Sequence, residues 1–177
     1  TLCMLFLTTN VISQTTTLYS NDFESSTTGY ITTTTKTDDV WKYEWTNHSS
    51  CTSTDIWRVD NSGGYGTAGD ITGNYVSIDY GSQSCVQDVS FAIKEFTPTQ
   101  NTINVSFDWS FKDYTGSTLI IKLYDAAGNP IHTLVSVSSD DNGKYSGSLS
   151  VTAGTTYTID FRYTASWDYG AKIDNIS

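Results

Sequence analysis

Residues 104–111, Asn-Val-Ser-Phe-Asp-Trp-Ser-Phe, alternate between polar and apolar side chains without a break. Successive side chains of a β-strand point to opposite faces, so this period of two predicts a strand with one buried and one solvated face. Val105, Phe107, Trp109 and Phe111 form the apolar set. Strands of a β-sandwich have this pattern, because one face of each sheet packs against the other sheet.

The same alternation continues along the chain in residues 119–124 and 157–164. Shorter candidate strands are 17–24, 56–60, 74–80, 131–137, 144–151 and 171–176. Gly, Asn and Asp lie between many of them, as chain reversals require, and from Asn101 onward the strands recur roughly every dozen residues. We therefore expect an all-β fold, an antiparallel β-sandwich of the jelly-roll type, with a single domain over residues 15–177.

The charge of the chain excludes several classes of partner. It has 9 Lys and Arg against 19 Asp and Glu, a net charge of -10. No basic stripe could neutralise phosphates, so nucleic acid is excluded, and the same sign disfavours anionic membranes. The acidic residues include only three glutamates, Glu24, Glu44 and Glu95, and all the others are aspartates. Aspartate suits loops and cation sites with oxygen ligands.

Residues 1–14 are expected to be the remnant of a signal peptide. The apolar part of this segment is too short to span a bilayer, and the polar run 15–17 follows it. An N-terminal core strand is the alternative. No other segment is long and apolar enough to insert into a membrane. We therefore expect a secreted or cell-surface protein.

Removal of that segment would leave Cys51 and Cys85 as the cysteines of the mature chain. Two cysteines in an exported domain most simply form a disulfide, which here closes a loop of about 35 residues and contributes roughly 3–4 kcal/mol. A metal site is the alternative, but the chain has only two histidines, His48 and His132, and no C-x-x-C pair.

Three short motifs occur in an order known from one group of domains. They are Asn-Asp-Phe-Glu at 21–24, the stretch from Asp-Ile-Thr-Gly-Asn-Tyr to Tyr80 at 70–80, and residues 107–123 followed by Asp-Tyr-Gly-Ala-Lys-Ile-Asp-Asn-Ile at 168–176. Together they resemble the MAM-type jelly roll and its bacterial relatives, the cleaved-adhesin and choice-of-anchor J domains. The sparse cysteines favour the bacterial relatives, and the Thr-rich stretch 27–37 has no counterpart in the pattern.

This resemblance implies an extracellular sandwich that binds structural calcium and mediates adhesion, substrate attachment or carbohydrate binding. It implies calcium ligands at Asp22, Glu24, Asp70 and Asp174. Asp22 and Glu24 lie two residues apart and so share one side of an extended strand. Ca²⁺ takes six to eight oxygen ligands, and the alternative is four solvated or capping acids.

Aromatic residues supply candidates for ligand contact. Trp41, Tyr43 and Trp45 alternate, so they would share one side of a strand, and Trp167 and Tyr169 lie just before the last predicted strand. Aromatic faces stack on sugar rings, although the alternative is that these side chains belong to the core.

Enzymatic chemistry has little support in the sequence. The three glutamates stand alone, and neither His48 nor His132 lies near a G-x-S-x-G motif. We expect a non-enzymatic adhesion or binding module of a larger secreted or surface protein. Its partners would be an extracellular glycan or protein and other domains of the parent chain. The alternatives are a carbohydrate-binding module and a structural or filament subunit.

Overall fold

A computed structural model gives the structure of this chain and describes residues 16–24, 29–30, 42–45, 57–61, 71, 73–79, 86–113, 116–166 and 169–177. Within these residues the chain forms strands and no helix. The strands are β1 (Gly29–Tyr30), β2 (Lys42–Trp45), β3 (Arg58–Asp60), β4 (Tyr75–Asp79), β5 (Val86–Ala92), β6 (Thr102–Lys112), β7 (Thr118–Asp125), β8 (Pro130–Val137), β9 (Asp141–Ser150), β10 (Tyr157–Ser166) and β11 (Gly170–Asp174).

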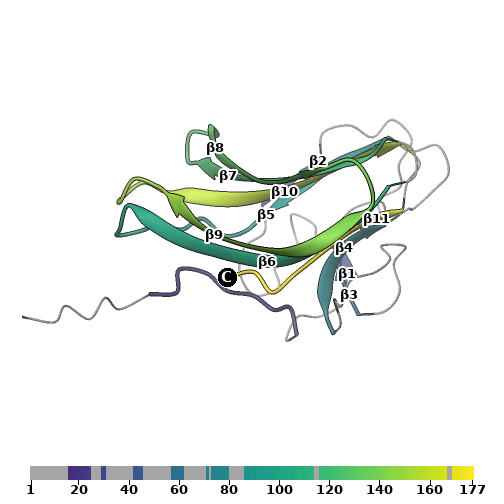
Figure 1. Ribbon diagram of the computed structural model, residues 1–177, viewed down its shortest axis with the longest axis horizontal. Helices are drawn as coiled ribbons and strands as arrows, with labels where there is room; N and C mark the ends of the chain where they lie inside the picture. Colours follow the sequence, from purple (N-terminus) through teal and green to yellow (C-terminus); the bar gives the residue numbers. More distant parts are fainter. Residues whose placement is uncertain are drawn as a thin grey trace, which may run out of the picture.

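The strands form two antiparallel sheets that pack face to face (Figure 1). One sheet has the order β1-β3-β4-β11-β6-β9, and the other has the order β2-β5-β10-β7-β8. From β9 onward each strand lies in the opposite sheet from the one before it, so the chain crosses repeatedly between the layers. The prediction of an antiparallel β-sandwich is confirmed.

Large aromatic side chains from both sheets fill the space between the layers. Phe161 of β10 stacks on Phe91 of β5 with ring centroids 4.6 Å apart, and it meets Phe107 of β6 edge-on at 5.6 Å. All three side chains are completely buried. Phe107 and Phe161 belong to the alternating runs that predicted the strands, so the core forms where the period of two predicted it.

The N-terminal segment differs from the prediction. Residues 17–24 were expected to form a strand, but only Asn21 makes a β-bridge, to Ile176. Phe23 follows with a φ of 57°, in the left-handed region, and this ends the extended conformation. Strand β5 is a second difference, because none of the candidate strands covered it.

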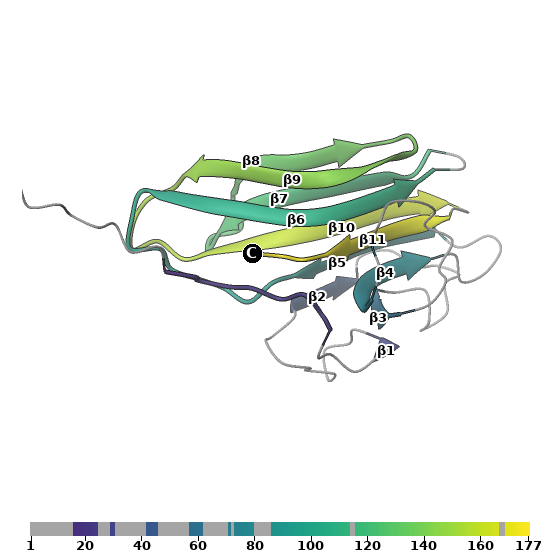
Figure 2. The same cartoon turned by 60° about the horizontal axis from the view of Figure 1, so that its bottom comes forward.

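The N-terminal segment and the C-terminal residues lie side by side (Figure 2). The backbone of Asn21 exchanges two hydrogen bonds with Ile176, of 2.8 and 2.9 Å, and Ser177 exchanges two of 2.8 Å with Ser106 of β6. Ile176 and Ser177 are therefore held between the N-terminal segment and β6. No helix in the described part of the chain is long and apolar enough to cross a bilayer.

Candidate functional site

Three segments that are distant in sequence meet where the N-terminal segment ends. The backbone N–H of Asn74, just before β4, donates to Oε1 of Glu24 at 3.0 Å, and the Asn74 side chain donates to the carbonyl oxygen of Glu24 at 3.3 Å. Gly73 leaves room for this contact, because a Cβ atom there would lie 1.8 Å from the same Oε1. The third segment is the end of β11, which Asn21 joins through Ile176. We call this region, with the carboxyl groups of Asp22, Glu24, Asp108 and Asp174, the acidic junction.

A β-bulge shapes the end of β11 at the junction. Asp174 pairs with Asp108, and Ser177 pairs with Ser106. Between these two pairs the segment after β11 advances by three residues while β6 advances by two, so one residue of that segment is extra, as in a β-bulge. Asn175 is the extra residue and has a φ of 52°, which asparagine tolerates better than most residues. Its side-chain amide donates to Oδ2 of Asp108 at 2.8 Å, and its backbone N–H donates to Oδ1 of Asp174 at 2.7 Å.

The carboxyl group of Asp174 is the buried acid of the junction, with 2% of the residue exposed. The pKa of Asp174 rises from 3.8 to about 7, mainly because the group is buried. The negative charges of Glu24, Asp108 and Asp22 contribute to this rise, and the hydrogen bond from the backbone N–H of Asn175 opposes it. A carboxylate with these surroundings is unfavourable unless a proton or a cation compensates its charge.

Three of the four predicted calcium ligands are Asp22, Glu24 and Asp174, and the first two lie near enough to Asp174 for their charges to raise its pKa. Asp70 lies outside the described residues. Asp108 was not among the predicted ligands, but β6 places it directly opposite Asp174 on β11, and its negative charge also raises the pKa of Asp174. Among the residues that the structure describes, no three Asp, Glu, His or Cys side chains are grouped closely enough to hold a metal ion as they stand. Calcium binding here stays a prediction.

The predicted ligand-binding aromatic residues do not form one described site. Trp41 and Trp167 lie outside the described residues. Strand β2 pairs Tyr43 with Phe91 and Trp45 with Val89, and both of these partners are buried. The ring of Tyr169 lies under the ammonium group of Lys112, with Nζ 5.2 Å from the ring centroid. Ligand contact by these residues stays a prediction.

Other predictions fall on parts of the chain that the structure does not describe. Cys51 and Cys85 both lie outside the described residues, as do residues 1–14, so the disulfide and the signal peptide stay predictions. His132, one of the two histidines, lies on β8, with Nε2 2.8 Å from the carbonyl oxygen of Ser150 on β9. That contact joins the two sheets at their edges.

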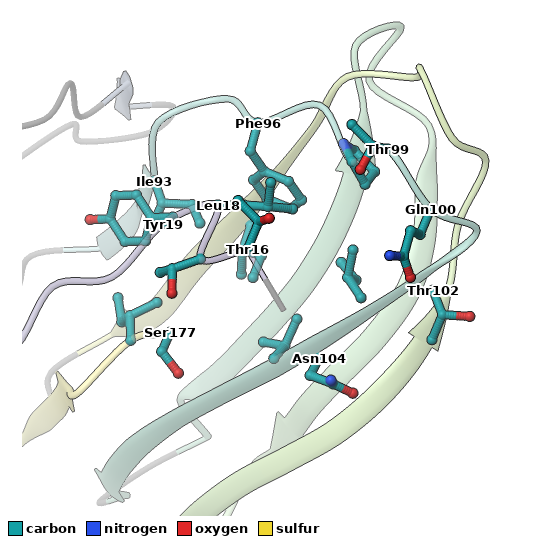
Figure 3. Close-up of a pocket in the computed structure, with 16 residues that line it drawn as sticks. Thr16, Leu18, Tyr19, Ile93, Phe96, Thr99, Gln100, Thr102, Asn104 and Ser177 are labelled. Carbon is teal, nitrogen blue, oxygen red and sulfur yellow. The ribbon is translucent and has the colours of Figure 1, made fainter. Parts of the chain in front are cut away.

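A cavity of about 270 Å³ lies beside Ile176 and Ser177. Residues 16–19 form one bank, residues 102–105 at the start of β6 form the other, and Ser177 stands at one end (Figure 3). We call it the β6 slot. Its lining contains no charged residue, although the chain has 28 of them, 9 basic and 19 acidic. Five buried aliphatic side chains contribute to the lining: Ile93, Ile103, Val105, Ile159 and Ile176.

No family model matches this chain, and no curated protein matches it. Solved structures do resemble it. The K1 cleaved adhesin domain of Lys-gingipain from Porphyromonas gingivalis W83 has 15% sequence identity and a TM-score of 0.54, over 89% of this chain and 95% of that domain. The K3 cleaved adhesin domain of the same protein has 18% identity and a TM-score of 0.53, over 90% of this chain and 96% of that domain.

A carbohydrate-binding module also resembles the chain. TmCBM61, solved in complex with β-1,4-galactotriose, has 12% identity and a TM-score of 0.50, over 77% of this chain and 85% of its own. At these identities the likeness extends to the fold and no further. The chain therefore has the β-sandwich fold that the cleaved adhesin domains share, along nearly the whole of their length.

Proposed function

We propose that this chain is an extracellular binding module with a role in adhesion, and that its partner is a glycan or a protein. The observation that carries the proposal is the likeness to two cleaved adhesin domains over 89–90% of this chain and 95–96% of theirs. A likeness of this extent covers the domain as a unit, rather than one shared layer of strands. Fold alone does not determine function, so the proposal needs a direct test.

Carbohydrate binding is the more specific candidate within this class. Support comes from the likeness to TmCBM61, whose structure contains β-1,4-galactotriose. It also comes from the predicted aromatic contacts at Trp41, Tyr43, Trp45, Trp167 and Tyr169, since aromatic faces and neighbouring polar groups hold sugar rings.

Structural calcium is part of the proposal. The acidic junction offers only oxygen ligands, as Ca²⁺ prefers, and its buried member Asp174 lies near three other carboxylates. A divalent cation would compensate this charge and would hold the N-terminal segment, β6 and β11 together. The side chains of Asp22, Glu24 and Asp108 would have to turn toward Asp174 to complete a coordination shell.

The test is retention of the labelled, folded chain on a glycan array and on a panel of extracellular proteins, with millimolar calcium and with excess chelator. We expect saturable binding to a restricted set of ligands, stronger with calcium. The heat-unfolded chain is the matched control and should lose this selectivity. If the folded chain retains no ligand under either condition, the proposed function is wrong.

A further inference from the structure

The outer face of the six-stranded sheet carries a row of polar side chains where β3, β4, β11 and β6 lie next to one another (Figure 2). Arg58 of β3 is directly opposite Ser77 of β4. Ser77 is in turn opposite Lys172 of β11, and Lys172 is opposite Ser110 of β6. Directly opposed residues point to the same face, with Cβ atoms about 4.5–5.5 Å apart. Val76, next to Ser77 in the chain, belongs to the core, so this row points away from the core.

Ser77 has a buried hydroxyl group that lacks a hydrogen-bond partner. The residue is 1% exposed, and its Oγ forms no hydrogen bond with any group in the described part of the chain. A buried hydroxyl group without a partner is unfavourable, because it loses its hydration on folding and gains no bond in exchange. Native proteins contain few such groups, and a ligand that bonds to the hydroxyl group gives a reason for this one.

Lys172, directly opposite Ser77, is a second group with unused hydrogen-bonding capacity. Its side chain is partly buried, and its ammonium group lies over the ring of Tyr75, with Nζ 4.5 Å from the ring centroid. Within the described residues the ammonium group makes no hydrogen bond and no ion pair. An ammonium group has three N–H donors, and the contact with a ring face leaves them available to an acceptor.

An ion pair between Arg58 and Asp60 completes the group. Nε of Arg58 donates to Oδ2 of Asp60 at 2.9 Å, and Nη2 lies 2.9 Å from the same oxygen. Asp60 is directly opposite Tyr75, the residue on which the ammonium group of Lys172 lies. The side chains of Arg58 and Asp60 are 23% and 15% exposed, so both reach the surface. We call Arg58, Asp60, Tyr75, Ser77 and Lys172 the Ser77 site.

The charges of the Ser77 site define the chemistry of its ligand. Arg58 and Lys172 are cationic and Asp60 is anionic, so the site has one excess positive charge in a chain with a net charge of -10. A ligand group with a single negative charge, such as a carboxylate, balances this excess. Because a carboxylate side chain only accepts hydrogen bonds, Asp60 favours a ligand that also donates one. Sugar acids carry a carboxylate and hydroxyl groups on one ring, whereas acidic amino-acid side chains lack the hydroxyl group.

We propose that the Ser77 site binds the carboxylate group of an acidic sugar. Lys172 and Ser77 donate hydrogen bonds to the carboxylate, and Asp60 accepts one from a neighbouring sugar hydroxyl group. The inference rests on the proposed binding function and specifies it: the ligand is an anionic glycan. Ser77 is buried, so a neighbouring side chain has to rotate to admit the ligand, and Lys172 has no described hydrogen bond that would prevent this. The charge-assisted bonds to the carboxylate are the stronger ones and dominate recognition.

The experiment titrates the isotope-labelled full chain with methyl β-glucuronide and follows it by nuclear magnetic resonance. We expect saturable shifts of the signals of Ser77 and Lys172, with an affinity that falls as salt is added. Methyl β-glucoside, which has a hydroxymethyl group in place of the carboxylate, should bind at least about tenfold more weakly. Acetate and acetyl-aspartyl-amide test a carboxylate without the sugar. Equal binding of either one would show that the ligand is not an acidic sugar.

Variants locate the binding on the protein. Ser77→Ala should weaken glucuronide binding about tenfold, which is the effect of one hydrogen bond to a charged group. This variant should be at least as stable as the unaltered chain, because the hydroxyl group has no described partner, whereas a purely structural hydroxyl group would cost stability. Lys172→Met should also weaken binding. Lys112→Met is the matched control, since Lys112 lies over the ring of Tyr169 on the same sheet but 4.0 Å from Asp140, and it should leave binding unchanged.

Calcium at the acidic junction is the other route by which a carboxylate would bind. The titration is therefore repeated after calcium has been removed on a chelating resin, with thermal melting as the check that every protein is folded. Binding that the folded chain loses with calcium would overturn the inference. So would the absence of shifts at Ser77, or unchanged binding in both Ser77→Ala and Lys172→Met. Retention on the glycan and protein arrays is measured separately, so the proposed function can stand even when the glucuronide does not bind.

Discussion

Replacing Asp174 by Asn should stabilise the calcium-free protein at neutral and alkaline pH, and should remove its stabilisation by calcium. Asp174 is 2% exposed and lies near Glu24, Asp108 and Asp22, so its charged form is unfavourable without a cation. Asn has the same shape, can still accept the hydrogen bond from the backbone N–H of Asn175, and carries no charge.

The magnitude follows from the pKa of Asp174, which rises from 3.8 to about 7 in the folded protein. Between these values the folded state binds more protons than the unfolded state, so the free energy of unfolding falls as the pH rises from about 4 to 7. Each pKa unit corresponds to about 1.4 kcal/mol, and the full shift corresponds to about 4 kcal/mol. We expect Asn to recover about 1–3 kcal/mol of this at pH 8, because a buried amide still loses its hydration.

The assay is urea denaturation of both proteins at pH 5 and pH 8, with chelator and with millimolar calcium. In chelator the unaltered protein should lose stability between the two pH values more steeply than the variant. Calcium at pH 8 should stabilise only the unaltered protein, by about 2.7 kcal/mol at a hundredfold excess over Kd. A variant that is less stable than the unaltered protein in chelator at pH 8 would show that the charge of Asp174 is not unfavourable in the folded protein.

Asp125→Asn is the matched control for this prediction. Asp125 accepts hydrogen bonds from the backbone N–H groups of Ala127 and Asn129 and from the Asn129 side chain, and these bonds lower its pKa. Its substitution should therefore destabilise the protein at pH 8 and leave the response to calcium intact.

Three further predictions follow from the core, the junction and the cysteines. Phe161→Ala should lower the free energy of unfolding by about 3–5 kcal/mol in urea denaturation, since Phe161 is completely buried between both sheets, and a loss below about 1 kcal/mol would contradict that packing. Gly73→Ala should weaken the increase in melting temperature that calcium produces, because the added Cβ would displace Glu24. Gly128 also has a positive φ, but a Cβ there would have nothing within 4 Å, so Gly128→Ala should destabilise the protein without changing the effect of calcium. Cys51 and Cys85 should resist alkylation until reductant is added, as measured by intact mass, and two free thiols in the native secreted protein would exclude the disulfide.

Local sequence pattern was sufficient to predict the long strands. In β6, β7 and β10 the apolar residues repeat with a period of two and bury one face, so each strand carries its own signal. Strand β5 has a weaker signal. Val89 and Phe91 keep the period, but Ala92 and Ile93 follow and are both buried, which breaks the alternation.

The candidate sites depended on register between distant strands, which local pattern does not contain. Asp108 is 66 positions from Asp174 in sequence and joins the acidic junction only because β6 and β11 pair at that point. The bulge at Asn175 and the left-handed backbone of Phe23 lie on either side of the bridge between Asn21 and Ile176, which joins segments distant in sequence.

The most direct test of the binding function is to measure saturation and chemical change on the same ligand. Each glycan or protein that the folded chain retains is titrated to equilibrium, and its mass is followed for hours in the presence of catalytic amounts of the chain. We expect saturable, reversible binding with the ligand recovered unchanged. Turnover of the ligand to a product by a small amount of the chain would contradict it.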